Sequence, residues 1–319
     1  MKTIGVLTSG GDAPGMNACI RSIVRSSIYS GLKVKGIKFG YDGLINRKII
    51  DMDVSSVADI IHRGGTILGS ARSKEFETEE GQYKAIKILE EEGIEGLVLL
   101  GGDGTFRGAH EISKKGIKVI GIPCTIDNDM GYTDLTIGFS TAVGTVVEAI
   151  GRLRDTSSSH GRGNVLEVMG RNCGDIALYS GIAGGAESII VPEIDMNLEE
   201  IIEKVNQGKK RGKLHHIVIV AEGVGDSFKI AKKIENSTGV ETKVTVLGHI
   251  QRGGTPSPED RILASEFGSS AVDLLIENKT DIAIGKKNGK VIFRTIEEAV
   301  EIKKEFNTYL YEMSKKLSI

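Results

Sequence analysis

The sequence has no tryptophan, and aromatic side chains make up only 5% of its 319 residues. Proteins that bind single-stranded nucleic acid stack the bases on aromatic side chains, so this composition argues against that class of ligand. The 41 basic residues are offset by 43 acidic ones, which leaves a formal net charge of −2. Without a strong excess of basic residues, we expect no nucleic-acid partner and no membrane partner.

Cysteine is also scarce, and the three residues Cys19, Cys124 and Cys173 form no CxxC pair and have no histidine at metal-binding spacing. This pattern argues against a disulfide scaffold and a zinc site, and it suits a reducing cytosol. No run of about 18 apolar residues occurs, so we expect no membrane-spanning helix. A glycine loop begins by Gly10, which leaves no room for the core of a signal peptide. The sequence therefore predicts a cytoplasmic protein.

Glycine, by contrast, is abundant: the chain has 42 of them, about 13% against a usual value of about 7%. This excess predicts many places where the backbone turns sharply or approaches a ligand closely. The apolar fraction of 39% and the charged fraction of 26% are typical of a globular protein. The length suggests about two domains.

Short apolar runs alternate with longer helical patterns along most of the chain. Two of these runs, 97–100 and 217–220, are continuously apolar, as in strands that are covered on both faces. The alternation predicts an α/β fold with right-handed crossovers. Two doubly wound, mostly parallel-sheet domains, with the chain crossing between them, fit best, although the strand count alone also allows a TIM barrel. The expected strands are Thr3–Leu7, Val34–Phe39, Leu97–Leu100, Val119–Ile122, Val165–Val168, Ser188–Val191, Ile217–Ala221 and Lys243–Leu247. The expected helices are Met16–Ser30, Glu79–Glu92, Thr141–Asp155, Leu198–Gln207, Pro258–Glu277 and Ile296–Lys316.

Glycine-rich or acidic segments follow three of the expected strands, at the strand ends where such sheets bind ligands. The first segment, 8–17, leads into a helix near Met16, so its backbone N–H groups and the helix dipole favour an anion. It is not a Walker A loop, because it contains no Gly-Lys-Ser or Gly-Lys-Thr. The other two segments, 101–105 and 123–129, combine glycines or carboxylates with the same position after a strand, and we expect a further helix to follow 101–105.

Asp103 and Asp127 place one carboxylate on each of these two later loops. Phosphoryl transfer from a magnesium nucleotide needs backbone donors for phosphate, a carboxylate for the cation and a second carboxylate to receive a hydroxyl proton. Two acidic loops on neighbouring strands therefore favour phosphoryl transfer. A Rossmann dehydrogenase explains the first glycine loop but needs neither carboxylate, and a nucleotide sensor without activity would not need both.

Six segments, by their order and spacing, carry a resemblance to a known family: Gly10–Asn17, Gly101–Thr105, Thr125–Asp129, Met169–Arg171, Ala221–Gly223 and Gly248–Gly254. From end to end, the chain resembles bacterial ATP-dependent 6-phosphofructokinases. The resemblance implies Mg²⁺-dependent phosphoryl transfer from ATP to the 1-hydroxyl of fructose 6-phosphate, in a homotetramer whose active sites are shared across an interface. It implies an ATP-binding domain, 1–138 plus 251–301, and a sugar-phosphate-binding domain, 139–250 plus 302–319.

The resemblance also implies roles for individual residues. Asp127 matches the general base that takes the proton of the sugar hydroxyl, and Asp103 matches the Mg²⁺ ligand. Arg72 matches a residue that neutralises the transferring group, and Thr125 and Arg171 complete the implied catalytic set. The implied ATP contacts are Gly11, Arg72, Ser73, Gly102, Asp103, Gly104 and Thr105. The implied sugar-phosphate contacts are Thr125, Asp127, Arg162, Met169, Gly170, Arg171, Glu222, Lys243, His249 and Arg252, with Arg162 and Lys243 coming from a neighbouring subunit.

A second, allosteric anion site is implied as well. Arg21 and Arg25 are four residues apart and share one face of the first expected helix. The residues that match the family's effector pocket are Arg21, Arg25, Arg154, Gly185, Glu187, Arg211 and Lys213. We expect ADP to activate and phosphoenolpyruvate to inhibit, more weakly than in relatives because Leu214 stands where lysine is usual.

Several positions depart from the family pattern. Lys243 stands where arginine is usual, so it keeps the charge but lacks the planar fork that binds phosphate through two hydrogen bonds. Ser73 replaces a cysteine, and Cys124 replaces a glycine. The pyrophosphate-dependent branch of the family tends to carry aspartate in place of Gly104 and lysine in place of Cys124. This chain has neither, which favours ATP over pyrophosphate as the phosphoryl donor.

Overall fold

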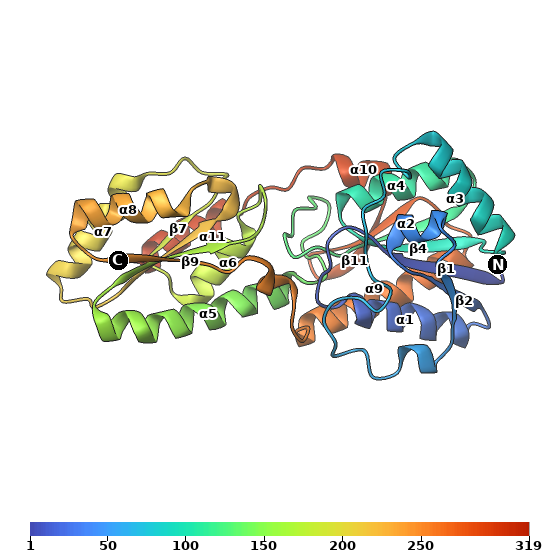
Figure 1. Ribbon diagram of the computed structural model, residues 1–319, viewed down its shortest axis with the longest axis horizontal. Coiled ribbons are helices and arrows are strands. Elements are labelled where there is room, and N and C mark those ends of the chain that lie inside the picture. The colour runs from blue at the N-terminus through green and yellow to red at the C-terminus, as the bar shows by residue number, and fades with distance from the viewer. Residues whose placement is uncertain (319) are drawn as a thin grey trace. The chain divides into compact units, whose positions relative to one another are not determined.

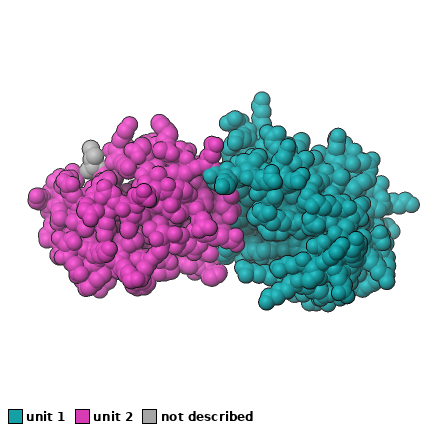
Figure 2. All heavy atoms as spheres, turned by 90° about the horizontal axis from the view of Figure 1, so that it is seen from above, with its two compact units in different colours: residues 1–126, 130–141, 252–304 teal, residues 127–129, 142–251, 305–319 magenta. Residues whose placement is uncertain are grey.

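The computed structural model describes residues 1–318, and its contacts divide the chain into two compact units (Figure 1, Figure 2). The chain passes between the units several times rather than through a single linker. Ile319, the last residue of the predicted sugar-phosphate-binding domain, lies outside the described residues. The first unit comprises residues 1–126, 130–141 and 252–304, and the second comprises residues 127–129, 142–251 and the chain from Glu305 on.

The strands of the first unit are β1 (Thr3–Thr8), β2 (Lys33–Ile37), β3 (Ile49–Met52), β4 (Gly96–Gly101), β5 (Lys118–Pro123), β10 (Ile282–Lys287) and β11 (Lys290–Thr295). They form one seven-stranded sheet in the order β11-β10-β5-β4-β1-β2-β3. The five inner strands are parallel, whereas β3 and β11 pair antiparallel at the edges. Every residue of β1 and β4 is buried, as expected for apolar strands covered on both faces.

The helices of the first unit are α1 (Met16–Tyr29), α2 (Gly40–Ile45), α3 (Glu79–Glu91), α4 (Asp103–Lys114), α9 (Pro258–Ile276) and α10 (Ile296–Glu301). Helices α1 and α9 pack against each other on one face of the sheet, and α2, α3 and α4 cover the other face (Figure 1). Under this second layer, apolar side chains that include Leu44, Leu89 and Phe106 form one buried cluster. The sheet therefore holds its strand ends at fixed positions between two helical layers.

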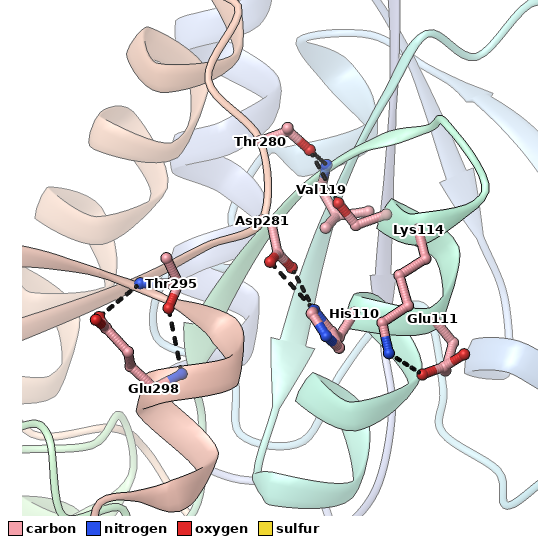
Figure 3. Close-up of polar contacts among 9 residues, drawn as sticks. His110, Glu111, Lys114, Val119, Thr280, Asp281, Thr295 and Glu298 are labelled. Carbon is pink, nitrogen blue, oxygen red and sulfur yellow. Dashed lines mark hydrogen bonds and ion pairs between the residues drawn. The ribbon is translucent and has the colours of Figure 1, made fainter.

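The last strands of the first unit are joined to its centre by polar contacts (Figure 3). Val119 N donates a hydrogen bond to the Thr280 hydroxyl at 3.1 Å, which ties the segment before β10 to the neighbouring strand β5. On α4, His110 Nδ1 lies 2.9 Å from Oδ1 of Asp281. These contacts hold a segment that is more than 150 residues distant in sequence against the middle of the sheet.

The second unit contains the strands β6 (Gly163–Val168), β7 (Ser188–Ile190), β8 (His216–Ala221) and β9 (Thr242–Val246). They form a parallel sheet in the order β7-β8-β6-β9. Val165, Val218 and Ile234 belong to the apolar cluster between this sheet and its helices. The helices of this unit are α5 (Phe139–His160), whose first turn lies in the first unit, α6 (Asp175–Gly184), α7 (Leu198–Lys210), α8 (Ser227–Thr238) and α11 (Thr308–Leu317).

The two sheets confirm the predicted α/β class with mostly parallel strands, and their open order is not that of a TIM barrel. The single helix predicted over Ile296–Lys316 is wrong, because 302–307 separates α10 from α11. A capping box that starts at Thr295 begins α10, and the Asn307 side chain accepts a hydrogen bond from Leu310 N at the start of α11. Strands β3, β10 and β11 and helices α2, α6 and α8 are absent from the prediction. Within residues 1–318, no helix combines the length and the apolar character that crossing a bilayer requires.

Candidate active site

The carboxyl ends of β5, β4 and β1 lie next to one another, because these strands are neighbours and parallel in the first unit. Backbone hydrogen bonds continue just past the strands: Ser9 N donates to Leu100 O and Cys124 N donates to Gly101 O, each at 3.0 Å. The segments expected to bind the nucleotide follow these strands directly. They therefore lie along one edge of the sheet.

The first turn of α4 has open space in front of it. A Cβ atom built on Gly104 meets no other atom within 4 Å, so packing does not explain the glycine at this position. Gly101 differs, because a Cβ there would lie 2.2 Å from the Thr105 hydroxyl. A Cβ on Gly102 would lie 3.9 Å from that of Thr125, which brings the β4 and β5 loops together. The N-terminal N–H groups of a helix beside open space form a ready site for phosphate.

Asp103 begins α4, and its side chain is 47% exposed. Its Oδ2 atom lies 3.0 Å from Nε of Arg107, one turn further along the helix. Exposed pairs at this spacing contribute only about 0.3–0.5 kcal/mol. The carboxylate can therefore exchange Arg107 for a stronger cationic partner.

Arg252 belongs to the first unit and packs on its first glycine loop. A Cβ built on Gly11 would lie 2.2 Å from Nη1 of Arg252, so a side chain at Gly11 would displace the guanidinium. The same nitrogen donates to Asp12 O at 3.4 Å. The guanidinium that the resemblance assigns to the sugar phosphate thus lies against a residue assigned to ATP.

Asn17 is a buried residue of α1 that the sequence analysis does not identify. Its side-chain amide donates to Arg63 O and Gly64 O at 3.0 and 3.1 Å, and its Oδ1 atom accepts from Ile67 N at 2.8 Å. These bonds fix the loop that leads to Arg72, whose side chain is exposed. A polar residue inside the first turn of a helix after a glycine loop is the only sequence signal for this contact. Ser73, next to Arg72, accepts a hydrogen bond from Phe76 N at 3.3 Å.

Asp127 is 1% exposed and lies in the second unit beside Arg171. Nε of Arg171 is 3.3 Å from Oδ2 of Asp127, while the backbone N–H of Arg171 donates to Glu222 at 2.8 Å. Arg171 has a φ of +53°, and Gly170 before it has a φ of +136°. A Cβ on Gly170 would lie 2.3 Å from Cys173 O, so this tight turn requires glycine. The turn joins three residues of the implied sugar site, Asp127, Arg171 and Glu222.

Two buried polar side chains support this turn, and the sequence analysis assigns a role to neither. Gln251 is fully buried; its Oε1 atom accepts from Met169 N at 3.2 Å, and its amide donates to Gly248 O at 3.0 Å. Asn128 has a φ of +52°, and its amide donates to Asp175 at 2.8 Å. The contacts of Gln251 with Met169 and of Asn128 with Asp175 join residues far apart in sequence, so the periodicity of the sequence does not reveal them.

Arg162 and Lys243 meet at one carboxylate. Glu241 accepts from Nε of Arg162 at 2.6 Å and from Nζ of Lys243 at 2.7 Å. These hydrogen bonds, that of Lys243 first, lower the pKa of Glu241. The two cationic side chains are 38% and 57% exposed and thus available to a further anion. His249 is also exposed.

Comparisons with known proteins identify the family and the fold. A family model described as Phosphofructokinase matches residues 3–275. The ATP-dependent 6-phosphofructokinases of Finegoldia magna and Alkaliphilus metalliredigens are 66% and 59% identical to this chain over 319 residues, with full coverage of both partners. The chain belongs to the phosphofructokinase family.

Solved structures agree with this assignment. The phosphofructokinase from Saccharomyces cerevisiae matches all of this chain with a TM-score of 0.89 and 35% identity, and this chain spans about half, 48%, of that longer chain. A pyrophosphate-dependent phosphofructokinase from Marinobacter aquaeolei has a TM-score of 0.86 over 97% of this chain and 86% of its own. At 23% identity that likeness shows a shared fold alone.

Four residues of the implied effector set lie close together in the second unit of this phosphofructokinase. Arg154 donates to the carbonyl groups of Gly184 and Gly185, the latter at 2.9 Å. Buried Glu187 lies 2.6 Å from Nζ of Lys213 and accepts from Ile217 N at the same distance. Burial raises the pKa of Glu187, but the hydrogen bonds from Lys213 and Ile217 outweigh it and lower the pKa overall. Exposed Arg211 directly follows α7, two residues before Lys213, and Arg21 and Arg25 lie on α1 in the first unit.

His216 starts β8 beside this group and gives a prediction for acid stability. Burial lowers the pKa of His216 to about 4, and within the described residues its Nε2 atom has no hydrogen-bond partner. An unfolded histidine titrates near 6.5. Between pH 6.5 and 4 only the unfolded chain binds this proton, so the stability present above pH 6.5 is lost as the pH falls. We expect this residue to lower the free energy of unfolding by about 2 kcal/mol from pH 8 to pH 5.

Urea unfolding of the parent and of His216→Gln at pH 5 and pH 8 measures this effect. The variant should show a smaller pH-dependent loss, by about the stated amount. His62→Gln, at an exposed histidine, serves as the control and should behave like the parent. An equal loss in the parent and in His216→Gln would exclude a neutral buried imidazole.

Mg²⁺ fits the first turn of α4 by its preferred mode of binding. Within residues 1–318, no group of three or more histidine, cysteine or acidic residues could hold a metal by itself. Mg²⁺ keeps several waters and commonly binds through one or two carboxylates together with substrate phosphates. A half-exposed Asp103 beside the open space at Gly104 matches that mode.

Proposed function

We propose that this phosphofructokinase transfers the terminal phosphoryl group of ATP to the 1-hydroxyl of fructose 6-phosphate. The single observation that carries the chemistry is the buried Asp127 carboxylate beside Arg171, within a turn that also engages Glu222. The choice of ATP is supported by the names of the Finegoldia magna and Alkaliphilus metalliredigens relatives. The open space at Gly104 supports it further, because it leaves room for a nucleotide where the pyrophosphate-dependent branch tends to carry an aspartate.

In this proposal Asp127 accepts the proton of the 1-hydroxyl while that oxygen attacks the terminal phosphorus of ATP. The bond from this phosphorus to the β-phosphate oxygen breaks, and the products are fructose 1,6-bisphosphate and ADP. Gly11, Gly102, Gly104 and Thr105 form the cradle for the ATP phosphates, and the backbone N–H groups of the three glycines serve as donors. Arg72 and Arg171 stabilise charge that develops on the transferring group. Ser73 completes the contacts to ATP, and Thr125 completes those to the sugar.

Asp103 holds Mg²⁺ in this proposal. The bound cation would neutralise negative charge on the phosphates. Helix α4 places this carboxylate in its first turn, where the helix dipole also favours the binding of anions.

One coupled assay tests the proposed function against its alternatives. We expect turnover with fructose 6-phosphate, Mg²⁺ and ATP, and little with pyrophosphate in place of ATP. Equal or greater turnover with pyrophosphate would assign the chain to the other branch. Turnover with a nicotinamide cofactor but not with ATP would indicate a dehydrogenase, and nucleotide binding without turnover would indicate a sensor.

We propose that Arg162 and Lys243 bind the 6-phosphate of a sugar held by a neighbouring subunit of a homotetramer, together with His249 and Arg252. Their exposure at one surface carboxylate, Glu241, supports this assignment. Met169, Gly170 and Glu222 hold the sugar itself. The cytoplasm, where sugar phosphates and ATP are made, is the proposed location.

Lys243→Ala is expected to raise KM for fructose 6-phosphate by roughly tenfold or more with little change in kcat. The 6-phosphate does not react, so its contacts stabilise ground and transition states alike, and a hydrogen bond to a charged group contributes about 1.5–3 kcal/mol. Glu241→Gln is the matched variant: it frees both cations and should lower KM. Steady-state kinetics of the two variants check this, and an unchanged KM in Lys243→Ala would remove the residue from the phosphate site.

We also propose that ADP activates and phosphoenolpyruvate inhibits at the effector set, by favouring different states of the tetramer. Arg154→Ala or Arg211→Ala should raise the half-saturating concentration of both effectors by roughly tenfold, with kcat at saturating substrate within twofold of the parent. Lys210→Ala, at the exposed basic residue next to Arg211, serves as the control and should keep both responses. Full responses in the Arg154 and Arg211 variants would place the effector site elsewhere.

A further inference from the structure

Asp260 is a charged residue in the first turn of α9 that is only 1% exposed. Its Oδ1 atom accepts from Gly138 N at 2.9 Å. Its Oδ2 atom accepts from Thr141 N at 2.8 Å and from the Thr141 hydroxyl at 2.5 Å. A buried carboxylate needs several such donors to replace water, and here the three shortest bonds come from the segment at the start of α5, with the Ser257 hydroxyl as a longer fourth donor at 3.5 Å.

The contacts around Asp260 close into a ring. The Thr141 hydroxyl donates to Asp260 and accepts from Ser257 N at 2.9 Å. The Ser257 hydroxyl in turn accepts from Asp260 N at 3.1 Å, which caps α9. Gly138, Thr141, Ser257 and Asp260 therefore form one network, which we call the Asp260 network. Its position is set by the rigid helix α9 rather than by a loop.

The segment held by this network supports the loop that follows β5. Ile137 N donates to Pro123 O at 3.0 Å. The Thr136 hydroxyl donates to Thr125 O at 2.7 Å. These two bonds fix the backbone at residues 123–126, and Asp127 is the next residue in the chain.

The same segment packs against the first glycine loop. Gly138 has a φ of +106°, and a Cβ there would lie 2.7 Å from that of Ala13 and 3.3 Å from Ile126 Cγ2. A Cβ on Gly15 would lie 2.6 Å from Ile137 Cγ2. Two loops assigned to catalysis thus touch one short segment, whose backbone Asp260 holds.

We propose that Asp260 is a positioning residue: through residues 136–141 it fixes the loop that carries Asp127. This inference rests on the proposed function of Asp127. Asp260 itself touches neither reacting group. Because misplacing reacting groups by about 1 Å reduces rates roughly 10²-fold, a loss of this support appears mainly in kcat.

Asp260→Asn is the most direct test, because an amide keeps the shape but turns an N–H group toward N–H and O–H donors. We expect kcat to fall roughly 10–100-fold, with KM for ATP and for fructose 6-phosphate within threefold of the parent. Glu259→Gln, on the exposed side of the same turn, is the matched control and should stay within twofold. Kinetics are measured on the full-length assembly, well below the melting temperature of each variant.

A second pair of variants keeps the test decisive if Asp260→Asn does not fold. Thr141→Val removes the bridging hydroxyl and should lower kcat about tenfold, whereas Thr141→Ser retains the hydroxyl and should restore kcat to within twofold. A merely structural role would not give this rescue in kcat at equal folded fraction. The proposal is overturned if the folded variants Asp260→Asn and Thr141→Val both keep kcat within threefold of the parent, or if Thr141→Ser loses as much as Thr141→Val.

Amide hydrogen exchange separates this inference from the proposed function, because it needs no activity. Exchange at Ile137 and Gly138 should be at least tenfold faster in Thr141→Val, and in any folded Asp260→Asn, than in the parent. Unchanged exchange there overturns the network whatever the kinetics show. A parent that does not phosphorylate fructose 6-phosphate would refute the proposed function, and with it the role toward Asp127, while the exchange data still decide whether Asp260 holds the segment.

Discussion

Asp127→Asn is expected to lower kcat with fructose 6-phosphate by about 10²–10⁴-fold, which corresponds to roughly 3–5 kcal/mol of barrier. Asparagine has nearly the same shape as aspartate but accepts no proton at neutral pH. Asp127 is 1% exposed, so water does not readily replace it as the proton acceptor. KM for ATP should change little, because the ATP contacts come from other loops.

The comparison needs a variant in which the same chemical change is harmless. Asp134→Asn provides it, because Asp134 is exposed and its carboxylate accepts from Asn288 N at 2.7 Å, in a loop outside the assigned site. Asp134→Asn should keep kcat within twofold. A correctly folded Asp127→Asn enzyme with nearly normal kcat would refute the assignment of Asp127 as the base.

The sequence predicts the strands that precede the candidate catalytic loops well, because these strands are short, buried and largely apolar. Leu97–Leu100 is buried on both faces, and the strand before Asp127 is its neighbour in the sheet. The prediction fails for the hairpin of β10 and β11, whose strands are partly exposed and less apolar. Its turn did carry a signal, because Asn288 and Gly289 both have positive φ and Asn-Gly is a typical hairpin turn.

Helix α6 is absent from the prediction for a different physical reason. It is apolar on nearly all sides and largely buried, so it lacks the two-faced pattern by which helices are recognised. The long helix over Ile296–Lys316 fails because apolar periodicity continues across 302–307, while the capping residues Thr295 and Asn307 mark two separate starts.

Sequence patterns do not reveal the buried polar residues that support the site. Asn17 holds a loop about 50 residues away, and Gln251 and Asp260 bind backbone groups that are 82 and 122 residues distant. Each is a single buried polar side chain, and no motif or periodic pattern in the neighbouring sequence marks it. Only the folded chain brings such a side chain to its donors or acceptors.

Asp103→Asn is expected to lower kcat by roughly 10²–10³-fold and to raise the Mg²⁺ concentration needed for half-maximal rate. The carboxylate is the ligand that a hard cation prefers, and an amide oxygen carries no net charge. Mn²⁺ binding in the presence of a non-hydrolysable ATP analogue, followed by electron paramagnetic resonance, gives a readout that does not depend on turnover. Unchanged Mn²⁺ binding in Asp103→Asn would move the metal site away from α4.

The ion pair between Asp103 and Arg107 gives a second test of the metal assignment. If Asp103 binds Mg²⁺, the cation competes with Arg107, whose Nε atom lies 3.0 Å from the carboxylate. A pair of this kind contributes about 0.3–0.5 kcal/mol, which equals a change of about twofold in affinity. Arg107→Gln should therefore lower the half-saturating Mg²⁺ concentration by no more than about twofold and leave kcat near that of the parent. A large loss of kcat in Arg107→Gln would instead mean that the Asp103–Arg107 pair itself acts in the site, and the carboxylate would then not be free to hold the cation.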